Sequence, residues 1–431
     1  MISSSSFILG SKTVLIPPGC NTVKLNTPTL KVIESKKHMD QIDNLLTRGV
    51  DKIYPSKEAL EQLLRSDKKI RLYTGIDPTG KEIHIGHTTW MWKLRAFQDA
   101  GHEVIVLIGD FTGMIGDPSG KSEARIVLSK EQVLENAKTY KAQIGKIIRF
   151  QGENAAQIRF NSEWHSKMSA LEAARLMRHL TIAQVIERDM FQERLKSGKD
   201  LYLNEFFYPF LQGYDSVAMD VDLEVGGSDQ MFNMMTGRDL MKKIKGKEKF
   251  VMTLKLITDS SGKKIGKTEG NAIAIIRRPE ILYGQIMSLS DETIMPIFES
   301  CTNVPIDQIP HDLHPMDLKK RLAWQIVFQY NDKSAADEAQ TYFESTIQQG
   351  QVPADIPEVK VSSKNIVDVL VEANLASSKS EARRLIEQGG VQVNDEKIDS
   401  ERYTLDASPC TLRVGRRFAK ITPHFSSYSP S

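Results

Sequence analysis

The chain has 431 residues, of which 40% are hydrophobic and 26% charged, and its formal net charge is +2. This composition is ordinary for a globular protein of two or three domains. The small net charge excludes attraction of nucleic acid by the molecule as a whole, so any such contact must come from a local basic patch. No run approaches the roughly 20 apolar residues that a membrane-spanning helix needs. Cys20, Cys301 and Cys410 lie in no disulfide or zinc-binding spacing, so we expect neither a metal site nor a disulfide framework.

Residues 1–33 contain no Asp or Glu and are rich in Ser, Thr and Pro. We interpret 1–39 as a poorly ordered leader, with a cytoplasmic location as the expectation. The alternative is an organellar transit segment, although such segments are usually rich in arginine and this one has only lysines.

The chain beyond the leader begins with two short helices predicted within 40–64, where leucine and isoleucine recur on one stripe. Residues 70–77 then form a predicted buried strand, 87–101 a helix that ends at a glycine, and 102–110 a second apolar strand. A strand, a helix and a strand within about 40 residues predict a βαβ unit of a parallel sheet.

Residues 126–205 have charges interleaved with apolar residues and predict a helical insertion, after which 220–230 and 251–259 supply two further strands. We therefore predict the α/β class, with a Rossmann-like parallel sheet in a catalytic domain, a helical middle domain and a small C-terminal α+β domain. The expected boundaries are 40–270 for the catalytic domain, 271–350 for the helical domain, 351–363 for a linker interrupted by prolines, and 364–431 for the C-terminal domain.

The C-terminal domain has its own pattern of elements. Ser378 and Glu381 form a predicted capping box for a helix, 391–398 is predicted as a strand and turn, and 411–421 as one last strand. Its basic side chains predict a face that binds RNA phosphates, with a merely solvated charged surface as the alternative. The candidates are Lys379, Arg383, Arg384, Arg416 and Arg417.

Two histidines and a glycine occupy the junction between the first predicted sheet strand and the helix that follows it. A helix that begins near Gly86 directs its free N–H groups to the carboxyl edge of the sheet, where α/β proteins bind ligands. His84 and His87 can donate hydrogen bonds to a phosphate there, and Gly86 leaves room for a nucleotide against the backbone. The alternative is a helix cap and a loop residue without a catalytic task.

A second candidate element is the sequence KKIGKT at 263–268, in a loop after the last predicted sheet strand. Lys264 and Lys267 flank a glycine, so they can close over a triphosphate and stabilise the charge of departing pyrophosphate. A solvated lysine loop is the alternative. The occurrence of both elements in this order on one βαβ scaffold favours nucleotide chemistry.

These elements resemble the two signature motifs of class I aminoacyl-tRNA synthetases, with HIGH at 84–87 and KIGKT at 264–268. Further segments resemble the tyrosyl-tRNA synthetase family in particular, and the region after 363 resembles an S4-type RNA-binding domain. The segments are YTGIDPTG (73–80), GMIGDPSG (113–120), YPFLQGYD (208–215), GGSDQ (226–230) and KIGKTEG (264–270).

The resemblance implies that tyrosine is activated by ATP with Mg²⁺, giving tyrosyl-adenylate and pyrophosphate, and is then transferred to tRNA(Tyr). It also implies a homodimer formed through the helical region near 126–185. Such chemistry needs no protein nucleophile and depends on positioning and on charge stabilisation. The residues expected where charge develops are His84, His87, Lys264, Lys267 and Thr268.

The resemblance also assigns substrate-binding roles residue by residue. Tyr73 and Asp215 match positions that hydrogen-bond the phenolic hydroxyl group of the substrate. The positions near the α-ammonium and carboxylate groups are matched by Asp117, Tyr208, Gln212 and Gln230. The ATP-binding positions are matched by Gly75, Asp77, His84, Gly86, His87, Gly227, Asp229 and Lys267.

The nearest alternative enzyme is a tryptophanyl-tRNA synthetase, but an indole has no hydroxyl group for Tyr73 and Asp215 to bind. A small-molecule adenylyltransferase would not need the basic tail, and a catalytically silent RNA-binding paralogue would lack the histidine or lysine pair. The chain departs from the commoner family pattern at 110–111 (DF) and 231–233 (MFN). These departures change the expected shape of the pocket without removing its polar groups.

Overall fold

The computed structural model describes residues 41–66, 68–119, 128–259, 261–309, 313–348, 357–415 and 417–424. The expected leader, 1–39, and the candidate Arg416 lie outside these residues. Within the described residues, no helix is long and apolar enough to cross a membrane.

The first sheet has six strands in the order β1-β6-β5-β2-β3-β4. The strands are β1 (Val50–Tyr54), β2 (Arg71–Ile76), β3 (Glu103–Ile108), β4 (Gln157–Phe160), β5 (Leu223–Gly227) and β6 (Phe250–Leu254). Neighbouring strands are parallel except for β1, which runs antiparallel to β6. The central strands β2 and β3 are largely buried, as expected of a parallel sheet covered on both faces. The α/β prediction is therefore confirmed.

The sequence pattern does not predict β1 and β4, the two edge strands of this sheet. β1 lies between the two predicted N-terminal helices, and β4 lies within the segment predicted as a helical insertion. Both strands are short and have partly exposed polar side chains, so neither shows the continuous apolar run of a central strand.

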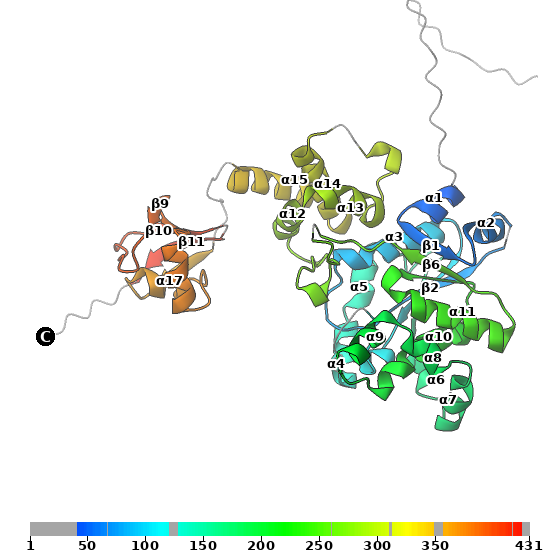
Figure 1. Ribbon diagram of the computed structural model, residues 1–431. Coiled ribbons are helices and arrows are strands. Elements are labelled where there is room, and N and C mark those ends of the chain that lie inside the picture. The colour runs from blue at the N-terminus through cyan, green and yellow to red at the C-terminus, as the bar shows by residue number, and fades with distance from the viewer. Residues whose placement is uncertain are drawn as a thin grey trace, which may run out of the picture. The chain divides into compact units, whose positions relative to one another are not determined.

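Helices before and between these strands cover the sheet (Figure 1). They are α1 (Gln41–Thr47), α2 (Lys57–Arg65), α3 (Ile85–Asp99), α4 (Lys130–Ala137), α5 (Tyr140–Ile144), α6 (Ser162–His165), α7 (Ala170–Met177), α8 (Ile182–Ile186), α9 (Asp189–Lys196), α10 (Leu203–Met219) and α11 (Met231–Lys245). α3 joins β2 to β3 and α11 joins β5 to β6, so both helices begin at the carboxyl edge of the sheet. Because β2 and β5 are neighbours and the chain leaves them in opposite directions, a ligand crevice is expected between them.

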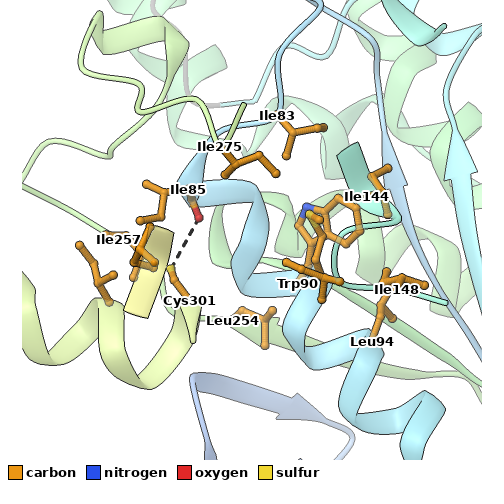
Figure 2. Close-up of a cluster of buried hydrophobic side chains, with 14 of the residues drawn as sticks. Ile83, Ile85, Trp90, Leu94, Ile144, Ile148, Leu254, Ile257, Ile275 and Cys301 are labelled. Carbon is orange, nitrogen blue, oxygen red and sulfur yellow. Dashed lines mark hydrogen bonds between the residues drawn. The ribbon is translucent and has the colours of Figure 1, made fainter. Parts of the chain in front are cut away.

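A helical region follows the sheet and shares its apolar core. Its helices are α12 (Pro279–Met287), α13 (Ile294–Cys301), α14 (Pro315–Tyr330) and α15 (Lys333–Tyr342). Figure 2 shows part of this common core, in which the thiol of Cys301 donates a hydrogen bond of 3.6 Å to the carbonyl oxygen of Ile85. Packing of α13 against α3 therefore helps to fix the start of α3, where the two histidines lie.

The C-terminal part has a second sheet, in the order β7-β11-β10-β8-β9, and an apolar core of its own. Its elements are β7 (Glu358–Val361), α16 (Ile366–Glu372), α17 (Lys379–Glu387), β8 (Val391–Val393), β9 (Glu396–Ile398), β10 (Cys410–Val414) and β11 (Arg417–Pro423). α17 begins at the predicted cap, because the hydroxyl group of Ser378 accepts a hydrogen bond of 3.2 Å from the Glu381 amide.

Two details of the C-terminal prediction differ from the structure. The segment 351–363, expected as a linker, contains β7, which pairs with β11 and buries the side chain of Val361. The segment 411–421, expected as one strand, is the hairpin of β10 and β11. Gly415 has a φ of +58°, a left-handed conformation that glycine adopts without strain and that turns the chain back on itself.

Candidate active site

The predicted histidine pair lies at the start of α3. His84 is the residue that precedes the helix, and its backbone N–H donates a hydrogen bond of 3.2 Å to Nδ1 of His87. The centroids of the two imidazole rings are 3.7 Å apart, and the side chain of His84 is buried. The rings therefore form one unit at the carboxyl end of β2, as the sequence predicts.

Both imidazoles are held in the neutral form. Burial, helped by the charges of Lys267 and Lys264, lowers the pKa of His84 to about 4. Burial, the His84 ring and the same lysines lower the pKa of His87 well below its usual value. At neutral pH these rings therefore act as hydrogen-bonding groups, and the positive charge of the site comes from the lysines.

The lysine loop folds over the start of α3. A Cβ atom at Gly86 would lie 2.8 Å from the carbonyl oxygen of Ile265, which belongs to this loop. A Cβ atom at Gly80, in the segment between β2 and α3, would lie 2.7 Å from Nζ of Lys267. Gly86, which the sequence predicts to leave room for the nucleotide, also leaves room for the lysine loop.

Lys264 reaches the residue predicted to bind the ribose of ATP. Its Nζ lies 2.6 Å from Oδ2 of Asp229, which comes two residues after Gly227, the last residue of β5. A Cβ atom at Gly227 would lie 2.5 Å from Oδ1 of the same carboxylate, so this glycine is needed where the carboxylate lies. The backbone of Thr268 continues the loop, and its side chain lies outside what the structure describes.

One cavity of about 440 Å³ joins these groups to the predicted tyrosine-binding residues. Its volume is in the range of about 300–1,000 Å³ that is typical of small-molecule sites. The predicted site residues in its lining are Gly75, Asp77, His84, Gly86, His87, Asp117, Tyr208, Gln212, Asp215, Gly227, Asp229, Gln230, Lys264 and Lys267. The histidine pair and the lysine pair, far apart in the sequence, therefore meet at one cavity.

Polar side chains from α10, from α11 and from the turn before α11 meet the loop that holds Asp117. Nε2 of Gln230 donates a hydrogen bond of 2.8 Å to Oδ2 of Asp117. Nδ2 of Asn233 donates one of 2.9 Å to Oε1 of Gln212. Nδ2 of Asn233 also donates a hydrogen bond of 3.1 Å to Oε1 of Gln230, so one carboxylate and three amides are held together, a set of groups that suits the ammonium and carboxylate groups of an amino acid.

Asp77 is fixed by hydroxyl groups from two other segments. Thr112 donates a hydrogen bond of 2.7 Å to its Oδ1, and the hydroxyl group of Tyr208 donates one of 2.9 Å to its Oδ2. A Cβ atom at Gly109 would lie 1.9 Å from Oδ1 of Asp77, so only glycine fits beside this carboxylate. Tyr208, which the resemblance places near the substrate ammonium group, therefore also orients Asp77.

Of the two residues predicted to meet the phenolic hydroxyl group, Asp215 lines the cavity and Tyr73 does not, in the part of the chain that the structure describes. Tyr73 is completely buried, and its hydroxyl oxygen lies 2.9 Å from Oγ of Ser216. Nζ of Lys249 donates a hydrogen bond of 2.8 Å to the same Oγ and forms an ion pair with Glu224. Tyr73 thus belongs to a buried polar cluster beneath the cavity.

The residues that hold Asp215 are not predicted from the sequence. Asn161, Trp164 and His165 all donate hydrogen bonds to its carboxylate. They follow directly after β4, so polar side chains at the carboxyl end of a strand were the signal available. That signal is lost when the segment is interpreted as helical.

A second cavity of about 160 Å³ lies beside α3, away from this set of residues. Lys93 donates a hydrogen bond of 2.8 Å there to the carbonyl oxygen of Leu45, and burial lowers the pKa of Lys93 to about 7. Arg48 donates one of 2.7 Å to the carbonyl oxygen of Thr302. Because these cations satisfy the carbonyl groups at the ends of α1 and α13, their role is structural.

A parallel sheet with neutral histidines at a helix start and a lysine loop over them defines a class I aminoacyl-tRNA synthetase. Residues 65–348 match the family described as tRNA synthetases class I (W and Y), and residues 346–413 match the Tyrosine--tRNA ligase SYY-like C-terminal domain. The chain therefore belongs to the tyrosine–tRNA ligases of class I, which activate tyrosine with ATP and transfer it to tRNA.

The similarity to individual relatives extends over nearly the whole chain. Tyrosine--tRNA ligase of Carboxydothermus hydrogenoformans is 41% identical over 415 residues, which cover 91% of this chain and 99% of the relative. The enzyme of Shewanella oneidensis is 42% identical over 397 residues, covering 89% and 99%. Among solved structures, a C-terminally truncated mitochondrial tyrosyl-tRNA synthetase of Aspergillus nidulans has a TM-score of 0.61 at 21% identity, covering 73% of this chain and 96% of that one. This last likeness concerns the fold.

Proposed function

We propose that His84, His87, Lys264 and Lys267 bind the phosphates of ATP while the carboxylate of tyrosine attacks the α-phosphate. A bond forms between the carboxylate oxygen and the α-phosphorus, and the bond to the pyrophosphate oxygen breaks. The observation that carries this proposal is the meeting of the histidine and lysine pairs at one cavity. Neutral imidazoles donate hydrogen bonds to phosphate oxygens, and the ammonium groups stabilise the charge on the departing pyrophosphate.

The rest of the nucleotide would lie against β5 and its glycine turn. Asp229 is paired with Lys264, and the hydroxyl groups of the ribose would take the place of the ammonium group as donors to this carboxylate. Among the described residues, no group of three or more His, Cys, Asp or Glu side chains can hold a metal ion. In this proposal Mg²⁺ therefore enters with the phosphates of ATP, which is its usual mode of binding.

The tyrosine substrate would lie between α10 and the loop of Asp117. Asp117, together with Gln212 and Gln230, provides the carboxylate and amides for the ammonium and carboxylate groups of the substrate. Asp215 follows Gln212 on α10 and provides an acceptor for the phenolic hydroxyl group. A substrate without that hydroxyl group leaves part of the accepting capacity of this buried carboxylate unused, so phenylalanine is disfavoured.

ATP–pyrophosphate exchange with each of the twenty amino acids tests the proposed chemistry. We expect tyrosine alone to stimulate exchange, and Lys267→Ala to reduce it about 10²–10³-fold, as loss of a group that stabilises developing charge does elsewhere. Lys263→Ala is the matched control, because this exposed lysine lies in the same loop and is absent from the cavity lining. Stimulation by tryptophan, or full exchange in Lys267→Ala, would contradict the proposal.

The C-terminal domain is proposed to bind tRNA through its basic residues. Lys379 pairs with Asp368 at 2.7 Å and Arg383 pairs with Glu401 at 3.1 Å, so part of their charge is compensated. We therefore assign the larger share of phosphate binding to Arg384 and Arg417. Alanine at either position should raise KM for tRNA. The slope of the logarithm of tRNA affinity against the logarithm of salt concentration should become smaller by about one unit, while tyrosine-dependent ATP–pyrophosphate exchange stays unchanged.

We further propose a homodimer formed through the helical insertion. Large apolar side chains are exposed there, with Leu171 at 62%, Ile182 at 73% and Leu203 at 81% of their full surface. Exposed apolar side chains of this size are typical of association surfaces. Light scattering after size-exclusion chromatography should give twice the chain mass, and Ile182→Lys should give the mass of one chain.

The compartment is proposed to be the cytosol, with an organelle as the alternative that residues 1–39 would determine. A fusion of these residues to a fluorescent protein decides between the two. Diffuse fluorescence supports the cytosol, and concentration in an organelle overturns that assignment.

A further inference from the structure

The carboxylate of Asp215 is held by three donors from one short segment. Its Oδ1 accepts hydrogen bonds of 2.8 Å from Nε1 of Trp164 and of 2.7 Å from Nε2 of His165. Its Oδ2 accepts one of 3.3 Å from Nδ2 of Asn161. Because Oδ1 already has two donors and Oδ2 has one long contact, Oδ2 is the oxygen with capacity for a further donor from the cavity.

His165 is buried, with 4% of its surface exposed, and one of its ring nitrogens is engaged. The ring lies among other aromatic groups, with centroids 5.3 Å from Phe111 and 6.0 Å from Tyr214. Nδ1 has no hydrogen-bond partner among the described residues. A carboxylate oxygen only accepts, so a contact of 2.7 Å requires the proton on Nε2. Among the described residues, the hydrogen bond to Asp215 is therefore the one that the side chain of His165 forms.

We propose that His165 is a positioning residue that turns Oδ2 of Asp215 toward the phenolic hydroxyl group of tyrosine and thereby strengthens selection against phenylalanine. The inference rests on the proposed role of Asp215 as acceptor for that hydroxyl group. His165 lies behind the carboxylate, at Oδ1, so it acts through Asp215 without contacting the substrate. A carboxylate that is already held at one oxygen loses less conformational entropy, on accepting the substrate hydrogen bond, than a carboxylate that rotates freely.

His165 also opposes the rise in the pKa of Asp215 that burial causes. Burial raises the pKa of Asp215, and the hydrogen bond from His165 is the largest opposing effect, ahead of those from Trp164 and Asn161. The other charged or titratable groups near this carboxylate are Tyr73, whose own pKa it raises, and the Lys249–Glu224 pair. An uncharged Asp215 would present a proton to the phenolic oxygen in place of a strong acceptor, so loss of the His165 donor should weaken tyrosine recognition first at low pH.

Two substitutions test the inference. His165→Leu removes the donor and keeps the site apolar, whereas His165→Gln retains an amide N–H at a similar reach. Amino-acid-dependent ATP–pyrophosphate exchange is measured with tyrosine and with phenylalanine between pH 5.5 and 9, with kcat and KM determined separately. We expect His165→Leu to lower the tyrosine-to-phenylalanine ratio of kcat/KM about tenfold, mainly through KM for tyrosine, as loss of a hydrogen bond to a charged group does.

The acid limb of kcat/KM for tyrosine should move to higher pH in His165→Leu, and His165→Gln should restore both the ratio and the pH profile in large part. Equal losses toward tyrosine and phenylalanine with an unmoved pH profile would show a merely structural role and overturn the inference. If His165→Leu does not fold, His165→Asn replaces it, because the shorter asparagine amide cannot reach Asp215. An Asn variant with the same tyrosine-to-phenylalanine ratio and the same pH profile as the Gln variant would overturn the inference.

The proposed role of Asp215 is tested separately by Asp215→Asn. If this variant keeps the selectivity of the unmodified enzyme, the role of Asp215 in the proposed function fails, and the inference fails with it. If Asp215→Asn loses selectivity and His165→Leu does not, the role of Asp215 stands and the inference about His165 alone is refuted. His179→Leu, in the same helical insertion, is the control and should change neither selectivity nor the pH profile.

Discussion

Replacing Lys249 by methionine should destabilise the catalytic domain strongly. The side chain of Lys249 is completely buried, and its ammonium group forms an ion pair with Glu224. It also donates hydrogen bonds of 2.8 Å to Oγ of Ser216 and of 3.1 Å to the carbonyl oxygen of Met234. All three ammonium protons are therefore used. Methionine has a similar length and volume, so the substitution removes the charge without opening a large cavity.

The size of this destabilisation follows from Glu224, whose charge stays buried after Lys249 is replaced. Glu224 is 2% exposed and would keep hydrogen bonds from Gln212 at 3.2 Å and Ser216 at 3.3 Å. Leaving one charge of a buried pair uncompensated costs about 3–5 kcal/mol in the free energy of unfolding. At about 2–4 °C per kcal/mol for a domain of this size, the unfolding midpoint of the catalytic domain should fall by about 6–20 °C in differential scanning calorimetry.

The double variant Glu224→Gln with Lys249→Met should recover most of this loss, because neither charge then remains buried. Lys333→Met serves as a surface control, since Lys333 pairs with Asp337 at 2.8 Å where both side chains are exposed, and the midpoint should stay unchanged. A Lys249→Met variant that melts at the normal temperature, or a double variant less stable than the single one, would refute the reasoning.

Three further outcomes are expected from the geometry of the cavity. Gly109→Ala puts a Cβ atom 1.9 Å from Oδ1 of Asp77, so the carboxylate must move, and ATP–pyrophosphate exchange should fall about 10²-fold without a change in circular dichroism. Gly86→Ala puts a Cβ atom 2.8 Å from the carbonyl oxygen of Ile265, so the lysine loop is displaced, and kcat of exchange should fall while the Kd of tyrosine, measured by equilibrium dialysis, stays the same. The pKa of His84 is lowered from 6.5 to about 4, so the unfolded chain binds more protons between these values and stability falls as the pH decreases from 6.5 to 4. His84→Asn should reduce this loss in urea titrations at pH 4.5 and 6.5, and an identical loss in both proteins would contradict the assignment.

The sequence predicts the central strands and the start of α3 because their signals are local. A continuous apolar run indicates a strand buried on both faces, as in β3, and His84 and Gly86 mark the point where helix α3 begins. The carboxyl ends of β2 and β6 lie at one edge of the same parallel sheet, which is why residues near 84 and near 264 could be placed together.

The parts that sequence does not predict depend on pairing between distant segments. Lys249 and Glu224 look like ordinary polar residues at strand ends, and they become a buried pair only because β5 and β6 are neighbours in register. Asp215 can be recognised from its motif, but its donors Trp164 and His165 lie in α6, directly after the edge strand β4, whose short and partly exposed sequence carries no strong signal. The buried contact of Tyr73 with Ser216 is also not predicted from the sequence, because it depends on how α10 packs over β2.

The polar groups of the cavity are hydrogen-bonded to one another, and this determines how a substrate gains affinity. Gln230 donates to Asp117, and Lys264 pairs with Asp229, so a ligand that reaches these carboxylates exchanges one hydrogen bond for another. Exchanged hydrogen bonds contribute little net free energy, whereas a buried acceptor left without a donor costs about 1–3 kcal/mol. Binding strength should therefore come largely from the buried surface and the phosphate charges, and selectivity from the acceptor with remaining capacity. Oδ2 of Asp215 is such an acceptor, and the side chains that hold Oδ1 decide how well it is aimed.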